Sequence, residues 1–156
     1  MNELLLDTSY LLPVFGIRLE LRDFEKAFPN VLRKYSVIYN PASLVEAKWI
    51  VQKLRKENHN AGEGLLQAYR SGLRALASEP RLRQSILTDE MVEQIADRLL
   101  LKENLRDYFA RLVYATATRN DYLLLTEDRE LHHVAKRSHA RPKKIMNWNE
   151  LLSTLS

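Results

Sequence analysis

The sequence has 156 residues, of which 46% are apolar and 28% are charged. These values are typical of one globular domain and exclude a largely disordered chain. The formal net charge of +4 permits nucleic-acid binding without selecting it. The absence of cysteine excludes a disulfide framework and a cysteine-based zinc site.

The early apolar segments of the chain are short. Residues 4–6 and 11–15 are separated by Asp7, and no basic leader precedes them. We therefore expect neither a signal peptide nor a membrane span. A soluble, cytoplasmic protein is the expectation.

Strands and helices are expected to alternate along the chain. Short apolar runs predict strands at residues 3–6, 37–39, 85–87, 122–125 and 144–146. Helical periodicity is found at residues 18–35 (with a break at Pro29), 42–55, 65–76, 88–100 (with Thr88 as N-cap), 105–119, 129–137 and 149–155, and residues 56–64 are expected to form a loop or helix boundary. This alternation predicts one α/β domain, residues 1–156, whose parallel sheet of about four or five strands is covered on both sides.

Two acids follow predicted strands. Asp7 comes after the first strand and Asp128 after the strong strand at 122–125, and each has a threonine neighbour, Thr8 or Thr126. Ligands of open parallel sheets bind beyond the carboxyl ends of the strands. Either acid alone would be read as a solvated turn or a helix cap. Two acids at equivalent positions favour a functional site.

Clustered carboxylates need a cation, because their negative charges repel one another. Oxygen ligands in a chain without cysteine favour a hard ion such as Mg²⁺ or Mn²⁺. Such an ion can activate water and stabilise the charge that develops on a phosphodiester. The pattern is therefore compatible with metal-dependent phosphodiester hydrolysis.

Three segments carry a resemblance to a known family. "LLLDTSYLL" around Asp7, "SLVEAKW" around Glu46 and "YATATRNDYLLLTEDREL" around Asp128 resemble the PIN family, and especially its VapC-like toxins. The resemblance runs from residue 3 to about 152, and "LLLTEDREL" is its most specific part. It implies a three-layer α/β/α PIN-like fold, Mg²⁺ or Mn²⁺ in an acidic pocket, and RNA endonuclease activity.

The resemblance assigns roles residue by residue. Asp7 and Asp128 would ligate the metal, Glu46 would bind metal or help to activate water, and Thr126 would orient a carboxylate or water. Where the family usually has a further aspartate, this chain has Ala110. The nearest acid, Asp107, lies three residues earlier on roughly the same helix face and is the candidate replacement.

Three functional hypotheses follow. The first is a metal-dependent endoribonuclease, the toxin of a VapBC-type pair, which would form a homodimer and bind a VapB-like antitoxin. The second, favoured by Ala110, is a catalytically weakened or inactive PIN module that binds RNA or protein as a scaffold. A phosphotransfer domain is disfavoured, because a dehalogenase-type site needs an aspartate where Ser9 stands and a receiver domain needs acids where Leu5 and Leu6 stand.

Several other side chains have two interpretations. The adjacent His132 and His133 would point in different directions on a helix, and we assign them to the surface. Trp49 and Trp148 are expected in the core or in a subunit contact in preference to the alternative, a platform on which bases stack. Candidate contacts to the RNA backbone are basic and lie on a helix or near the C-terminus: Arg106, Arg111, Arg137, His139, Arg141, Lys143 and Lys144.

Overall fold

Five parallel strands form the centre of the fold in a computed structural model that describes residues 1–155. They are β1 (Glu3–Leu6), β2 (Ser36–Tyr39), β3 (Leu82–Gln84), β4 (Leu123–Leu125) and β5 (Lys144–Met146). The strand order is β3-β2-β1-β4-β5, so β1 lies in the middle. Leu5 of β1 is in register with Ile38 of β2 and with Leu124 of β4. The predicted parallel sheet is confirmed.

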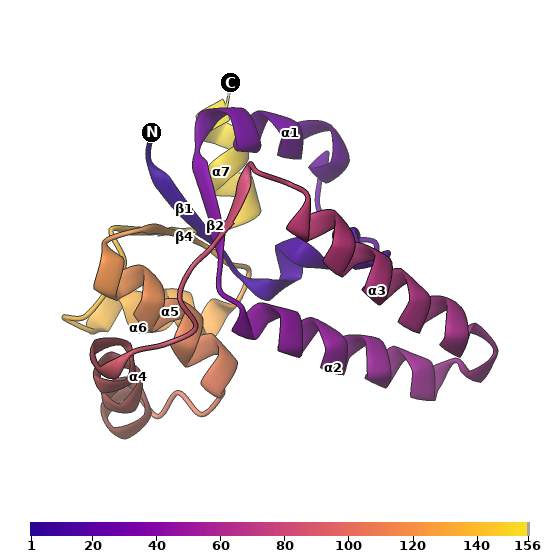
Figure 1. The fold of residues 1–156 in the computed structure, drawn as a ribbon. Helices are drawn as coiled ribbons and strands as arrows, with labels where there is room; N and C mark the ends of the chain where they lie inside the picture. Colours follow the sequence, from indigo (N-terminus) through magenta and orange to yellow (C-terminus); the bar gives the residue numbers. More distant parts are fainter. Residues whose placement is uncertain (156) are drawn as a thin grey trace.

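Helices cover both faces of this sheet (Figure 1). They are η1 (Thr8–Phe15, a 3-10 helix), α1 (Phe24–Lys34), α2 (Ala42–Glu57), η2 (His59–Ala61, also 3-10), α3 (Gly62–Ala77), α4 (Glu90–Glu103), α5 (Tyr108–Asn120), α6 (Arg129–Arg137) and α7 (Trp148–Leu155). Because successive strand residues point to opposite faces, Leu4 and Leu6 pack with η1, α1, α2, α3 and α7. Leu5 packs with α4, α5 and α6. The three-layer α/β/α prediction is confirmed.

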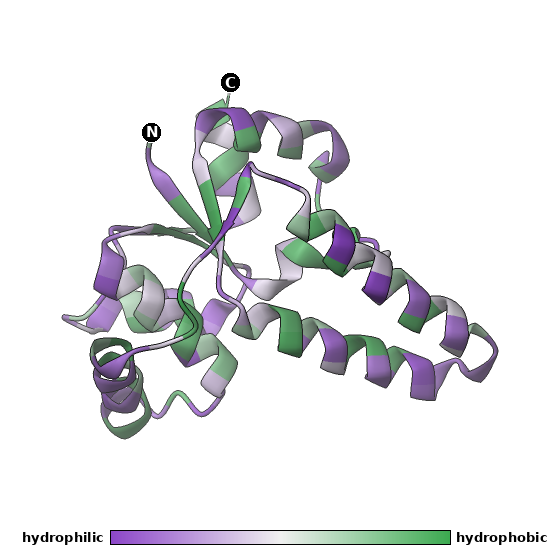
Figure 2. Cartoon of the chain, in the orientation of Figure 1, coloured by the Kyte–Doolittle hydropathy of each residue, from purple (hydrophilic) through white to green (hydrophobic). Residues whose placement is uncertain are grey.

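The apolar residues gather in and around the sheet, whereas the outer end of the α2–α3 pair is coloured mostly hydrophilic in Figure 2. The three strands β1, β2 and β4 are buried almost throughout, which explains their continuous apolar runs. No helix within residues 1–155 combines the length and the apolar character that crossing a membrane requires.

The helices α2 and α3 form a long antiparallel pair that projects away from the sheet in Figure 1. Its base is fixed against η1 by a close approach at Gly72. A Cβ atom at Gly72 would lie 2.4 Å from Phe15 Cδ1 and 2.7 Å from the carbonyl oxygen of Val14. Only glycine leaves room for that approach, and α3 therefore packs directly on the segment that follows Asp7.

Some predicted boundaries were wrong. The third strand lies at Leu82–Gln84 instead of residues 85–87, because Leu82 is buried while Ile86 and Leu87 are exposed. The fourth long helix is capped by Asp89, whose side chain accepts the backbone N–H of Val92, and not by Thr88. The hydroxyl of Thr88 instead donates to the carboxylate of Glu93, and Asp89 satisfies a free donor of the first turn.

The expected break at Pro29 and the extent of the first helix were also wrong. Helix α1 begins at Phe24, not at residue 18, and continues through Pro29 to Lys34. Phe24 and Val31 are buried on either side of the proline, so packing outweighs the hydrogen bond that proline removes. The prediction of a loop or helix boundary at residues 56–64 is confirmed, because α2 ends at Glu57, η2 follows and α3 begins at Gly62.

Candidate active site

An acidic pocket lies beyond the carboxyl ends of the central strands. The cavity has a volume of about 330 Å³. It is lined by Asp7, Thr8, Ser9, Glu46, Ile50, Asp107, Ala110, Glu127 and Asp128. All four acids that the sequence singled out therefore line one cavity, although they are separated by up to 121 positions in the chain.

Asp7 ends the central strand and is held at both carboxylate oxygens. Its Oδ1 accepts the backbone N–H of Thr8 at 2.8 Å, and its Oδ2 accepts the hydroxyl of Thr126 at 2.6 Å. Its own backbone N–H donates to Leu125, which continues the pairing of β1 with β4. Burial raises the pKa of Asp7, while these two hydrogen bonds oppose the rise and the negative charge of Asp128 adds to it.

Thr126 connects the two acids that follow strands. Its side chain is fully buried, and its hydroxyl donates to Asp7 while accepting the backbone N–H of Asp128 at 3.0 Å. Asp128 in turn caps α6, since its Oδ1 accepts the N–H of Glu130 at 2.9 Å. The predicted supporting residue thus fixes one acid directly and the other through its backbone.

Glu46 reaches the pocket from α2. Burial raises its pKa, and the charges of Asp7, Asp107 and Asp128 raise it further. Thr8 lies close enough to lower this pKa by hydrogen bonding, although its hydroxyl donates to Ser43 Oγ at 2.9 Å in this structure. The Thr8–Ser43 hydrogen bond ties the start of α2 to η1, which orients the helix that carries Glu46.

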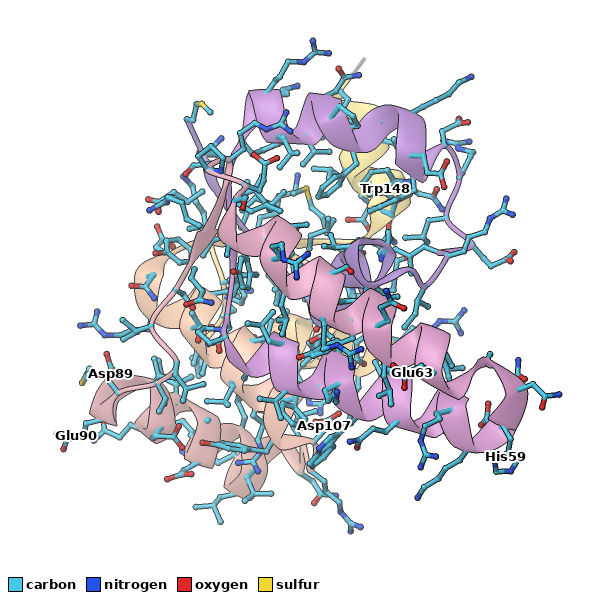
Figure 3. The ribbon with its side chains drawn as sticks, turned by 45° about the vertical axis from the view of Figure 1, so that its right-hand side comes forward. His59, Glu63, Asp89, Glu90, Asp107 and Trp148 are labelled. Carbon is cyan, nitrogen blue, oxygen red and sulfur yellow. The ribbon has the colours of Figure 1, made fainter. Side chains whose placement is uncertain are left out.

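Asp107 occupies the N-cap of α5 and is not inside the helix. Its Oδ1 accepts the N–H of Ala110 at 3.3 Å, and its side chain is exposed. Ala110 is buried and also lines the cavity. The position where the family usually has an aspartate and the candidate replacement Asp107 therefore both line the same pocket. In Figure 3, Asp107 lies beneath α2, between the sheet and the tip of the α2–α3 pair marked by His59.

The carboxylates share the cavity without forming a closed ligand set. Within residues 1–155, no group of three or more acidic or histidine side chains stands close enough together to hold a metal ion. Asp107 and Asp128 each use one oxygen to cap a helix. The donors are nevertheless all oxygen, and this chemistry fits a hard divalent cation.

Sequence reasoning missed two residues that organise the pocket. Glu127 lines it, and its Oε2 accepts the hydroxyl of Tyr10 at 2.6 Å and the backbone N–H of Trp148 at 2.8 Å. Asn40 is fully buried and accepts the N–H of Ala42 at 2.8 Å, which fixes the start of α2. Asn40 follows a strand as Asp7 does, so the same positional argument could have found it.

The amide of Asn40 also explains how distant elements meet at the start of α2. It donates to Thr116 Oγ1 of α5 at 3.1 Å and to the carbonyl of Leu87 at 3.0 Å. One buried side chain thereby links β2, α5 and the segment before α4. The position of α2, and with it that of Glu46, depends on this amide.

The remaining candidate residues divide between surface and interior. Arg111 is buried, with its guanidinium 5.1 Å from the Tyr108 ring centre, so its prediction as an RNA-backbone contact was wrong. Trp148, labelled in Figure 3, is in the core as expected, and its indole donates to the carbonyl of Arg22. Trp49 is not a core residue, because 61% of its surface is exposed.

The two histidines differ in exposure. His132 is half-buried, with its Nε2 2.8 Å from the carbonyl oxygen of Thr126, whereas His133 is exposed. The basic residues Arg106, Arg137, His139, Arg141, Lys143 and Lys144 are all exposed. Arg137 is paired with Glu103, which leaves less of its charge for an external anion.

No family model and no curated protein matches the sequence. Solved structures do match. VapBC2 from Rickettsia felis, solved bound to a DNA fragment from its promoter, has a TM-score of 0.63 at 17% identity, over 94% of this chain and 98% of the other.

Two further solved structures are similar. PAE2754 from Pyrobaculum aerophilum has a TM-score of 0.62 at 14% identity and covers 99% of this chain and 95% of its own. FitAB bound to the IR36 DNA fragment has a TM-score of 0.54 at 17% identity, over 92% and 94% of the two chains. Sequence identities this low establish a shared fold and do not establish a shared activity. The resemblance seen in the sequence is confirmed at this level: the chain has a PIN fold of the VapC-like type.

Proposed function

We propose that this chain is a divalent-metal-dependent endoribonuclease. The observation that carries the proposal is that Asp7, Glu46, Asp107 and Asp128, each predicted separately, line one cavity at the carboxyl edge of a parallel sheet. The raised pKa values of Asp7 and Glu46 support it, because negative charge gathered in a partly buried pocket is neutralised by a cation. An all-oxygen donor set favours Mg²⁺ or Mn²⁺.

The residues of the pocket would have different roles. Asp7 and Asp128 would bind the ion, and Thr126 would hold Asp7 in place while presenting Asp128. Asp107 would complete the ligands by turning from its capping position. The ion supplies charge neutralisation and lowers the pKa of a bound water.

Glu46 would accept the proton of the attacking water. A carboxylate whose pKa is raised is a better base than an ordinary one. Thr8, which is close to Glu46, would keep that carboxylate oriented toward the pocket. Hydrolysis would then cleave a phosphodiester bond that enters the cavity from solvent.

The first experiment is cleavage of an end-labelled, mixed-sequence RNA with added Mg²⁺ or Mn²⁺. The paired controls are EDTA and Asp7→Asn, which together separate this enzyme from a contaminating nuclease. Cutting that both controls abolish supports the proposal. No cutting by folded protein over a broad set of RNAs contradicts it.

A second candidate function is a non-catalytic scaffold for RNA or protein. Ala110 in the wall of the pocket, together with the lack of a closed ligand set within residues 1–155, favours this alternative. Metal titration by calorimetry distinguishes the two. Micromolar or tighter Mn²⁺ binding that Asp7→Asn removes supports the nuclease, while no binding supports the scaffold.

The partners are also a proposal. VapBC2 and FitAB were each solved bound to DNA, and their similarity to this chain supports a VapB-like antitoxin as its partner. We further propose a homodimer in the cytoplasm, with the antitoxin occupying the acidic groove. Light scattering of the isolated chain tests the homodimer, whose expected mass is about twice 18.3 kDa.

A further inference from the structure

A second groove is lined by the same helix, α2, that carries Glu46 into the acidic pocket, and the two hollows share no lining residue. It has a volume of about 660 Å³ and is lined by Lys48, Trp49, Gln52, Lys53, Arg55, Lys56 and Leu66. Glu46 and Ile50 of α2 face the acidic pocket, and Trp49 lies between them in sequence. At ~100° per residue, Trp49 and Lys53 lie within about 60° of Glu46 around the helix axis, so they form the edge of this groove that is nearer to the acids. We name it the α2 groove.

The α2 groove is strongly cationic. Four of its seven lining residues carry positive charge, and none of them carries negative charge. Among residues 1–155, Lys53, Arg55 and Lys56 take part in no salt bridge. Lys48 is directed over the ring of Tyr69 at 4.8 Å. Unpaired cations that line one hollow are suited to a chain of phosphates.

Trp49 gives the groove a stacking surface. Its side chain is 61% exposed, yet its ring is steadied by an edge contact with Phe109, with ring centres 5.2 Å apart and an angle of 89°. Phe109 follows Asp107 by two residues and belongs to the helix that forms a wall of the acidic pocket. A supported, exposed indole beside the pocket is available to stack on an unpaired base.

We infer that the α2 groove binds single-stranded RNA and guides it into the acidic pocket. Lysine and arginine side chains contact the phosphates, and Trp49 stacks on a base next to the scissile bond. The distance along α2 from Glu46 to Lys56 is about 15 Å at a helical rise of ~1.5 Å per residue, which is long enough for more than one nucleotide. A duplex fits less well, because its bases are already paired and stacked.

The inference rests on the proposed function, since it takes RNA as the substrate. It is tested without cleavage, by binding in EDTA. Tryptophan fluorescence is titrated with a short oligouridine, and the signal is specific because Trp148 is buried while Trp49 is exposed. We expect quenching of the exposed tryptophan. A matched RNA hairpin should quench it more weakly.

Variants assign the contacts. Trp49→Ala should weaken binding of labelled oligouridine, measured by anisotropy, about 5- to 150-fold, the range for loss of one stacked base, and Trp49→Phe should recover most of it. Lys53→Gln/Lys56→Gln should lower the slope of log affinity against log salt by about 1.4, since each phosphate contact to a single strand contributes about 0.7.

The control pair is Lys26→Gln/Lys136→Gln, which removes the same charge from exposed sites on α1 and α6. It should leave affinity and salt slope nearly unchanged. An equal loss in both pairs would overturn the inference, because net charge alone would then explain binding. Binding that leaves tryptophan emission unchanged would also overturn it.

Two further results would contradict the inference in favour of a protein partner. One is a change of mass in light scattering for Trp49→Ala, which would make Trp49 a subunit contact. The other is quenching by an acidic peptide as strong as that by RNA. Failure of the nuclease gives a different pattern: the groove would still bind RNA in EDTA, but no cleavage would follow when metal is added.

Discussion

The hydroxyl of Thr126 donates a 2.6 Å hydrogen bond to Asp7 from a fully buried position. The same hydroxyl accepts the backbone N–H of Asp128, so one oxygen atom spans the ends of β1 and β4. Removing it would leave the Oδ2 of Asp7 and the backbone N–H of Asp128, both partly buried, without this partner.

Replacing Thr126 with valine is therefore expected to weaken metal binding. Valine keeps the shape but not the hydrogen bonds, and loss of such an orienting group lowers metal affinity or activity about 10- to 100-fold. Thr126→Ser keeps the hydroxyl and should retain most of the affinity. Calorimetric titration with Mn²⁺ measures both variants, and equal affinities for valine and serine would refute the orienting role.

Asp7→Asn should stabilise the metal-free protein at neutral pH. The folded-state pKa of Asp7 is raised by burial, so the folded protein holds this proton more tightly than the unfolded chain. The free energy of unfolding is then greatest below the ordinary pKa near 3.8 and falls as pH rises toward the folded value. Asparagine removes the charge and keeps one acceptor oxygen for the backbone N–H of Thr8, while its amide nitrogen meets Thr126 as a donor. Chemical denaturation in EDTA across pH 4–8 measures the flattened profile.

An exposed acid away from the pocket is the control for that experiment. Asp97→Asn on α4 removes the same charge from a solvated position, so its profile should follow that of the unaltered chain. Added Mn²⁺ should stabilise the unaltered chain and the Asp97 variant but not the Asp7 variant. If the Asp7 variant is less stable than the unaltered chain at every pH, the buried charge of Asp7 is not the main factor that lowers the free energy of unfolding.

Ala110→Asp should strengthen metal binding. Ala110 is buried in the pocket wall, where an added carboxylate would face Asp7 and Glu46. Repulsion should lower the stability of the metal-free protein, and Mn²⁺ should restore it by mass action. Thermal unfolding with and without Mn²⁺ measures both effects, and the metal-induced rise in Tm should exceed that of the unaltered chain.

Asp107→Asn tests whether this chain already compensates for Ala110. If Asp107 binds the ion, its loss should lower Mn²⁺ affinity, and Ala110→Asp should recover it in the double variant. Unchanged affinity in Asp107→Asn would mean that the exposed aspartate only caps α5.

Two glycines of α3 give a matched pair for stability. Gly72→Ala should destabilise the protein by about 1–3 kcal/mol, because its Cβ would meet Phe15 Cδ1 at 2.4 Å and the backbone oxygen of Val14 at 2.7 Å. Gly64→Ala has nothing within 4 Å and should stabilise the helix by about 0.5–1 kcal/mol. Urea denaturation of both variants checks the opposite signs.

The central sheet could be predicted because its strands carry their own signal. Residues 123–125 are buried on both faces, and the leucines there mark a strand whatever surrounds them. The third strand was misplaced by three residues because it is an edge strand in which Arg83 and Gln84 are exposed. The more apolar residues 86–87 that follow it belong to the surface.

The candidate site was predictable where strand ends supplied the geometry. Asp7 and Asp128 follow strands, and parallel topology brings such positions together. The hydrogen-bond partners of Asn40 could not be predicted from residue spacing. The same holds for the burial of Arg111 and the exposure of Trp49. Arg111 is buried because α4 packs on α5, and Trp49 is exposed because α2 leaves the sheet; both facts depend on how helices far apart in sequence meet.

The acidic pocket has a consequence for the order of synthesis. Its walls come from residues 7, 46, 107 and 128, which span most of the chain. A nascent polypeptide that ends before β4 lacks both Asp128 and the hydroxyl that steadies Asp7. The pocket is thus assembled only after residue 128 has been synthesised, and no fragment that ends before that residue contains all of its walls.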